Sequence, residues 1–222
     1  MTRRGAFAEL RDFVDLLHSA GLTRYSSPVV EVPARLNDNE VIAVTTARHT
    51  GVHTGALGVA DEEECDFFFS PGNFAASFRA GDYAVVLRDG AMLQIRYDFD
   101  GDELVGHRLC YFPLPCDIPP DYLDEFSPAD VIEMVLDQEP RRVRLRSPLR
   151  FDYSAYDTSE DPEVHMHLLT DSGRLPVFGP LSLGHFVTLV FRTFYKSEWH
   201  DHHFLREYTP QLFWRTIVEE QE

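Results

Sequence analysis

Cysteine is scarce in the 222-residue sequence, and long hydrophobic runs are absent. The three cysteines, Cys65, Cys110 and Cys116, are odd in number and have no C-x-x-C spacing, which argues against a disulfide framework and against a cysteine-based zinc site. No apolar stretch approaches the roughly 20 residues that a membrane span needs. Charged residues such as Glu9 and Arg11 interrupt the N-terminal segment, so it lacks a signal-peptide core. These absences predict a cytoplasmic protein that does not bind a membrane.

Several catalytic signatures are missing as well. The sequence has no G-x-x-x-x-G-K phosphate loop, no G-x-G-x-x-G dinucleotide motif, no H-E-x-x-H helix and no G-x-S-x-G elbow. An ATPase, a dehydrogenase, a zincin or a hydrolase of these standard kinds is therefore disfavoured, and we expect no cofactor.

Basic residues are outnumbered by acidic ones, 20 to 37, and Lys196 is the sole lysine. The formal net charge of −17 repels polyanions at long range, which opposes indiscriminate binding to nucleic acid or to anionic lipid. The length and the 44% hydrophobic content are typical of one globular domain. We expect that domain to span residues 1–222, with its core in residues 82–196.

The first half of the chain predicts a helix followed by antiparallel strands. Apolar residues at helical spacing predict an N-terminal helix within residues 1–21. Turn signals at Asn37-Asp38-Asn39, Asp89-Gly90 and Asp100-Gly101 predict a hairpin and then a three-stranded meander. The expected strands are residues 29–32, 41–46, 82–88, 91–98 and 103–112. Residues 47–64 are expected to form a loop.

Apolar and polar residues alternate again over residues 141–178, which predicts a second meander. The fold class is therefore α+β, with one curved, mainly antiparallel sheet built from two meanders. Three further helices are expected: one that begins at Ser127-Pro128, a buried one near residues 182–196, and a C-terminal one within residues 197–222.

Strand parity in the second meander gathers five ionisable side chains on one face: Arg150, Asp152, His165, His167 and Arg174. Two histidines at positions i and i+2 of a strand point the same way, which suits acid–base work or joint metal ligation. Paired arginines suit a phosphate, and the aspartate could orient a histidine ring. We predict these five as catalytic residues of a metal-independent phosphodiesterase site. The alternatives are anion binding alone, a structural ion pair, and a metal site formed by the aspartate and the two histidines.

A basic stretch precedes this cluster and contains no acidic residue: Arg141, Arg142, Arg144 and Arg146. Such a stretch could follow a nucleic-acid backbone, bind an acidic partner, or contact the acidic segment 61–64 of the same chain.

Three histidines follow the predicted buried helix: His200, His202 and His203. The segment is expected to be an exposed loop, with metal binding as the weaker alternative.

Two blocks of the sequence carry a resemblance to a known family. The first block comprises residues 87–99, 107–109 and 111–115, and the second comprises residues 150–153, 162–165, 174–177, 186 and 194–195. Together they resemble an uncharacterised bacterial family, domain of unknown function 2290, over about residues 82–195. One departure is Asp161, where the family pattern implies a histidine. The family has no established activity, so the resemblance implies no mechanism. The R-F-D and H-x-H spacing is also similar to that of small bacterial toxin–antitoxin proteins.

Two functional hypotheses follow. The first is a bacterial protein of the defence or toxin–antitoxin kind that acts on or binds nucleic acid or phosphate through the Arg/Asp/His sheet face. The second is a non-catalytic subunit that binds a protein partner encoded nearby.

Overall fold

The computed structural model describes residues 1–46, 70–119, 121–144, 146, 148–156, 162–167 and 173–207. It divides into two compact units, Met1–Pro176 and Val177–Glu222. The first unit contains every strand of the described residues and all the predicted sheet-face residues. The expected loop over 47–64, Cys65, Asp161 and the C-terminal segment from residue 208 lie outside the described residues.

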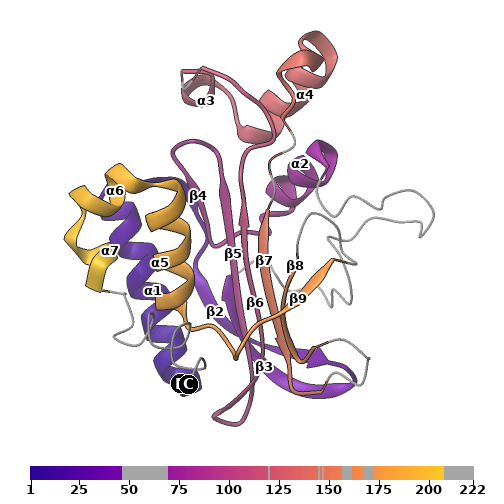
Figure 1. Ribbon diagram of the computed structural model, residues 1–222, viewed down its shortest axis with the longest axis vertical. Coiled ribbons are helices and arrows are strands. Elements are labelled where there is room, and N and C mark those ends of the chain that lie inside the picture. Colours follow the sequence, from indigo (N-terminus) through magenta and orange to yellow (C-terminus); the bar gives the residue numbers. More distant parts are fainter. Residues whose placement is uncertain are drawn as a thin grey trace, which may run out of the picture. The chain divides into compact units, whose positions relative to one another are not determined.

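Nine strands of the first unit form one open antiparallel sheet, and Figure 1 shows β5 to β9 side by side in sequence order. The strands are β1 (Thr23–Ser26), β2 (Val29–Leu36), β3 (Asn39–Thr46), β4 (Val85–Leu87), β5 (Met92–Asp100), β6 (Glu103–Phe112), β7 (Leu149–Ser154), β8 (Val164–His167) and β9 (Arg174–Pro176). The spatial order is β1-β4-β5-β6-β7-β8-β9, and β3 pairs with both β2 and β5. The predicted α+β class and antiparallel sheet are confirmed.

The helices of the first unit are α1 (Arg3–Ser19), α2 (Pro71–Ala80), α3 (Tyr122–Glu125) and α4 (Pro128–Gln138), followed by a 3-10 turn, η1 (Pro140–Arg142). The second unit contains α5 (Leu183–Phe194), α6 (Lys196–Asp201) and α7 (His203–Glu207). In the part of the chain that the structure describes, no helix combines the length and the apolar character of a membrane span.

The predicted turns fix the register of the strands. Asn37 and Asp38 both have positive φ, as a tight hairpin between β2 and β3 requires. Gly90 and Gly101 also adopt left-handed conformations, with φ of 85° and 60°, on either side of β5. The hairpin and the first meander are therefore confirmed.

Alternation along β5 predicts one core face and one polar face, the latter with Met92, Gln94, Arg96 and Asp98, but the structure buries residues on both faces. Leu93, Ile95, Tyr97 and Phe99 lie on one face, each at most 2% exposed. On the other face, Met92 packs with Cys110 and Phe112 into an apolar cluster with α2 and α4, which Figure 1 shows near each other. The polar part of this second face is therefore limited to the stretch beyond Met92.

The second meander begins later than predicted. Residues 141–144 do not extend β7, because Pro140 starts a 3-10 turn and Val143 forms only an isolated bridge with Cys116. The backbone of this stretch pairs instead with the proline-rich connector that follows β6, residues 113–119. The Arg144 amide donates to the Pro115 carbonyl over 2.9 Å. Alternation over residues 141–178 also predicts Arg142, Arg144 and Arg146 on the same sheet face as Arg150; that placement was wrong, because none of the three lies in a strand.

The second unit confirms the buried helix and corrects the loop that was expected after it. α5 buries Leu183, Phe186, Val190 and Phe191, and Ser182 caps its first turn. The histidine-rich segment that follows is helical, as α6 and α7, with Trp199 buried.

Candidate functional site: a polar cluster on one sheet face

Strand register brings the predicted residues into two adjacent rows. In one row, Arg150 of β7 lies opposite His167 of β8, which lies opposite Arg174 of β9. In the next row, Arg108 of β6 lies opposite Asp152, which lies opposite His165. The structure therefore places all five predicted side chains on one face, together with Arg108. We call these six residues the polar cluster.

Asp152 is the centre of the polar cluster. Its Oδ1 lies 3.1 Å from Arg108 Nε, and its Oδ2 lies 2.5 Å from an Arg150 guanidinium nitrogen. Burial by itself raises the pKa of Asp152, but the two guanidinium groups outweigh burial and hold that pKa well below its usual range. The carboxylate is therefore ionised at neutral pH.

The two histidines contact each other directly. His165 Nε2 lies 3.1 Å from His167 Nε2, and His167 Nε2 lies 3.1 Å from Asp152 Oδ2. His165 Nδ1 lies 2.7 Å from the Pro162 carbonyl oxygen. Because carbonyl and carboxylate oxygens only accept, His165 carries a proton on Nδ1 and His167 carries one on Nε2. The His165 Nε2 lone pair then faces that same His167 proton.

This contact makes the histidine pair one proton-sharing unit. An acid and a base that act on opposite sides of a phosphate need space for the phosphate between them, and 3.1 Å leaves none. The geometry therefore favours joint action of His165 and His167 over two separate catalytic roles. The same atoms, with Asp152, are a candidate set of metal ligands.

Burial differs across the polar cluster. Arg150, His165 and His167 are each at most 6% exposed, whereas the Arg108 side chain is 26% exposed. Arg174 is half-buried. Cys110 lies in the row of Arg150, but burial raises the pKa of its thiol to about 12, so it is not a nucleophile at neutral pH.

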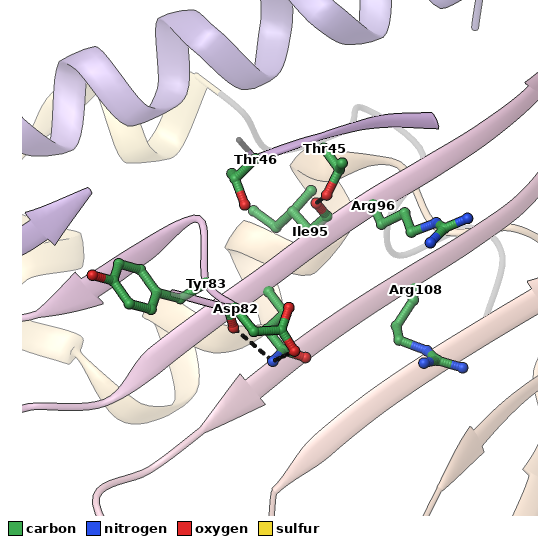
Figure 2. Close-up of a pocket in the computed structure, with 8 residues that line it drawn as sticks. Thr45, Thr46, Asp82, Tyr83, Ile95, Arg96 and Arg108 are labelled. Carbon is green, nitrogen blue, oxygen red and sulfur yellow. Dashed lines mark hydrogen bonds between the residues drawn. The ribbon is translucent and has the colours of Figure 1, made fainter. Parts of the chain in front are cut away.

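The polar face continues beyond the cluster onto β5, as Figure 2 shows. Arg96 lies directly opposite Arg108 in the ladder, the two side chains point the same way, and Arg96 pairs with Asp98 over 2.7 Å. Gln94 donates to the Asp82 carboxylate nearby. Asp82, Gln94, Arg96 and Arg108 are among the residues that line a pocket of about 10 Å³, which has room for about one water molecule.

Arg108 is the functional candidate that sequence reasoning missed. It sits between His107 and Leu109 in β6, and the two-residue period of a strand is the signal that puts it on the same face as Cys110. Its partner was not predictable from local pattern, because Asp152 follows 44 residues later. His107 faces the opposite side, near Tyr97 and Tyr153.

The basic stretch lies outside the polar cluster and is paired with acids. Arg144 and Arg146 both contact Asp117, at 3.1 Å and 2.6 Å, and Arg142 pairs with Glu139. Arg141 is exposed, and its carbonyl accepts from Arg144. The acidic segment 61–64, named as one possible contact, lies outside the described residues.

The histidines after α5 are separate from the cluster in sequence and in chemistry. His203 Nδ1 lies 3.0 Å from Glu207, and both side chains are well exposed. His200 is exposed and His202 is half-buried. In the described part of the chain, the candidate metal-ligand set is not here but at Asp152, His165 and His167.

Comparison with known proteins gives one match. A family model described as "Uncharacterized conserved protein (DUF2290)" matches residues 68–222. The chain belongs to the DUF2290 family. The matched span includes the whole polar cluster and begins just before α2. No curated protein and no solved structure matches the chain.

Proposed function

We propose that the polar cluster binds a phosphate group, with nucleic acid as the favoured source. The observation that carries this proposal is the excess of positive charge in the cluster. It contains three guanidinium groups and one carboxylate, a formal charge of +2 with neutral histidines, in a chain of net charge −17. Buried charges of this kind cost stability relative to apolar residues, which favours a functional reason for them.

The geometry supports a role for each side chain. Arg150 and Arg174 flank His167 from the two neighbouring strands, so they could hold two oxygens of one phosphate. Asp152 orients Arg108, Arg150 and His167 through direct contacts with its two carboxylate oxygens. His165 and His167 supply one shared proton to a phosphate bound beside them.

The test uses fluorescent single-stranded RNA and DNA oligonucleotides and measures affinity by anisotropy at fixed salt. Arg174→Gln removes one phosphate donor from a half-buried position and is expected to weaken binding about 10- to 100-fold. Arg11→Gln makes the same charge change at an exposed site in α1, distant in sequence from the polar cluster. It should change the affinity for the oligonucleotides less than about threefold. No binding by the wild-type protein, or equal losses in the two variants, would overturn the proposal.

The basic stretch is tested in the same assay. Arg144→Gln combined with Arg146→Gln removes both partners of Asp117. If this double variant loses affinity and Arg174→Gln does not, nucleic acid binds the basic stretch and the polar cluster is architectural.

A role of the defence or toxin–antitoxin kind adds a cellular prediction. Expression of the wild-type chain should slow growth of a bacterial host, and Arg174→Gln should restore growth at equal protein level. If hosts that express the wild-type chain and hosts that express Arg174→Gln grow equally well, the defence or toxin–antitoxin role is contradicted. The anisotropy measurement of phosphate binding is independent of this outcome.

Binding of a protein encoded nearby is the second candidate. It is favoured by large apolar side chains that are exposed at the end of α3 and in α4, shortly before the basic stretch in sequence: Phe126 is 43% exposed and Leu136 is 45% exposed. Co-expression with the product of each neighbouring gene should yield a stable complex that Leu136→Glu disrupts. A monomeric protein in every co-expression would exclude this candidate.

A further inference from the structure

We infer that Asp152, His165 and His167 form a binding site for one divalent transition-metal ion of the zinc class. The inference goes beyond phosphate binding and does not depend on it. The three ligand atoms all lie within 4.8 Å of one another. The side chains come from adjacent strands β7 and β8, so the sheet backbone holds their spacing.

The separations fit a single ion. Zinc sits about 2.0 to 2.2 Å from imidazole nitrogen and carboxylate oxygen, so in tetrahedral coordination neighbouring ligand atoms are about 3.3 to 3.6 Å apart. The His165–His167 and His167–Asp152 separations are both 3.1 Å. A point equidistant from all three atoms lies at most about 2.5 Å from each, so a small rotation of the rings completes the coordination.

The hydrogen bonds around the triad match those of metal-ligating side chains. His165 donates from Nδ1 to the Pro162 carbonyl oxygen over 2.7 Å, which fixes the ring with its Nε2 lone pair toward the triad. Ligating histidines are typically held by such a bond from the other ring nitrogen. Arg108 contacts Oδ1 of Asp152 and Arg150 contacts Oδ2, so the Oδ2 lone pair that faces His167 is the one left for the ion.

The ion takes the place of a proton. Two acceptor atoms, His165 Nε2 and Asp152 Oδ2, contact the protonated Nε2 of His167. When the His167 ring changes to the tautomer that carries its proton on Nδ1, Nε2 presents a lone pair, and the triad offers two neutral nitrogens and one carboxylate. Two histidines and one carboxylate leave coordination positions open, as catalytic zinc sites do.

Two nearby guanidinium groups oppose the ion. Arg108 and Arg150 both contact Asp152 and share its single negative charge. We therefore expect weaker affinity than at a triad without arginines, but a defined one-to-one complex at micromolar concentrations. Because the two positive charges disfavour a cation, the ion needs all three ligands, and loss of any one ligand should weaken zinc affinity strongly.

The experiment measures zinc uptake by the full-length protein after removal of any affinity tag and treatment with a chelator, with no phosphate present. The expected result is one zinc per chain by elemental analysis and a rise in melting temperature on zinc addition. His165→Gln and Asp152→Asn should each weaken zinc binding at least about 100-fold. His203→Gln, which removes an exposed histidine that also has a carboxylate partner, should leave zinc binding unchanged.

A measurement on the wild-type protein covers the case in which a triad variant does not fold. Zinc should shift the nuclear magnetic resonance signals of the ring nitrogens of two histidines, assigned to His165 and His167. Absence of stoichiometric zinc uptake, or uptake that shifts only His200, His202 or His203, would overturn the inference. Loss of phosphate binding with zinc binding intact would count against the proposed function alone.

Discussion

Two aspartates in this protein each hold two arginines, and they differ in burial. Asp152 contacts Arg108 and Arg150, and its side chain is 14% exposed. Asp117 contacts Arg144 and Arg146, and its side chain is 54% exposed. The same chemistry therefore occurs once inside a sheet face and once in a solvated connector.

The difference shows why charge pattern alone does not tell which arginines contribute most to stability. In sequence, residues 141–146 contain the densest run of arginines, yet Arg144 and Arg146 form solvent-exposed ion pairs of the kind that contribute little stability. Arg108 and Arg150 are farther apart in sequence but share a buried carboxylate. Water removal, and not local charge density, makes the second group energetically important.

The largest expected effect is on stability. Asp152→Asn removes the charge that compensates two mostly buried guanidinium groups, and we expect it to lower the free energy of unfolding by about 3 kcal/mol. Asp117→Asn makes the identical change at the exposed cluster and should lower it by less than about 1 kcal/mol. Denaturant unfolding at neutral pH measures both values. Equal losses would mean that burial does not distinguish the two clusters.

The next effect is a pH dependence of the free energy of unfolding. It comes from His107, which lies in β6 on the face opposite Arg108. Burial lowers the pKa of His107 from 6.5 to about 4, although the charge of Asp152 partly opposes the shift. The folded protein therefore keeps this ring neutral where the unfolded chain protonates it. Stability from His107 is complete above about pH 6.5 and declines as the pH falls from there to about 4, by about 3 kcal/mol at most.

The measurement is the free energy of unfolding from pH 7 to pH 4. His107→Gln should flatten the decline over this range, whereas His200→Gln, at an exposed position, should leave the decline as in the wild-type protein. A decline that is unchanged in His107→Gln would show that other groups cause the acid sensitivity.

The smallest effect is a salt dependence. At about 1 M salt the Debye length falls to about 3 Å, which screens exposed pairs far more than buried ones. The destabilisation by Asp117→Asn should therefore disappear at high salt, and that by Asp152→Asn should persist. Unfolding of both variants at low and high salt measures the contrast, and parallel loss of both effects would contradict it.

Much of the fold followed from local signals. Asn37-Asp38, Asp89-Gly90 and Asp100-Gly101 predicted the tight turns because few residues tolerate positive φ there. The two-residue period of strands put Arg150 with Asp152, and His165 with His167, on one face. Ser127 caps α4 as its sequence indicates.

Other features were missed although a signal was present. Helix α2 begins at Ser70-Pro71, the same cap and first-turn pair that identified α4, and Ser70 accepts from the Asn73 amide. The second meander was expected to begin at residue 141, where apolar and polar residues alternate, but Pro140 and Pro148 limit ladder bonds there. Local alternation there was outweighed by pairing with the connector.

The amino-acid sequence determined which side chains share a face, because parity and turn chemistry act between near neighbours along the chain. Tertiary structure decided which of those side chains touch. The register between β6 and β7 set Arg108 against Asp152, and the pairing of the connector set Arg144 and Arg146 against Asp117. Only the packed fold removes water from the arginines around Asp152 and leaves water around those that contact Asp117. Burial depends on segments that are distant in sequence.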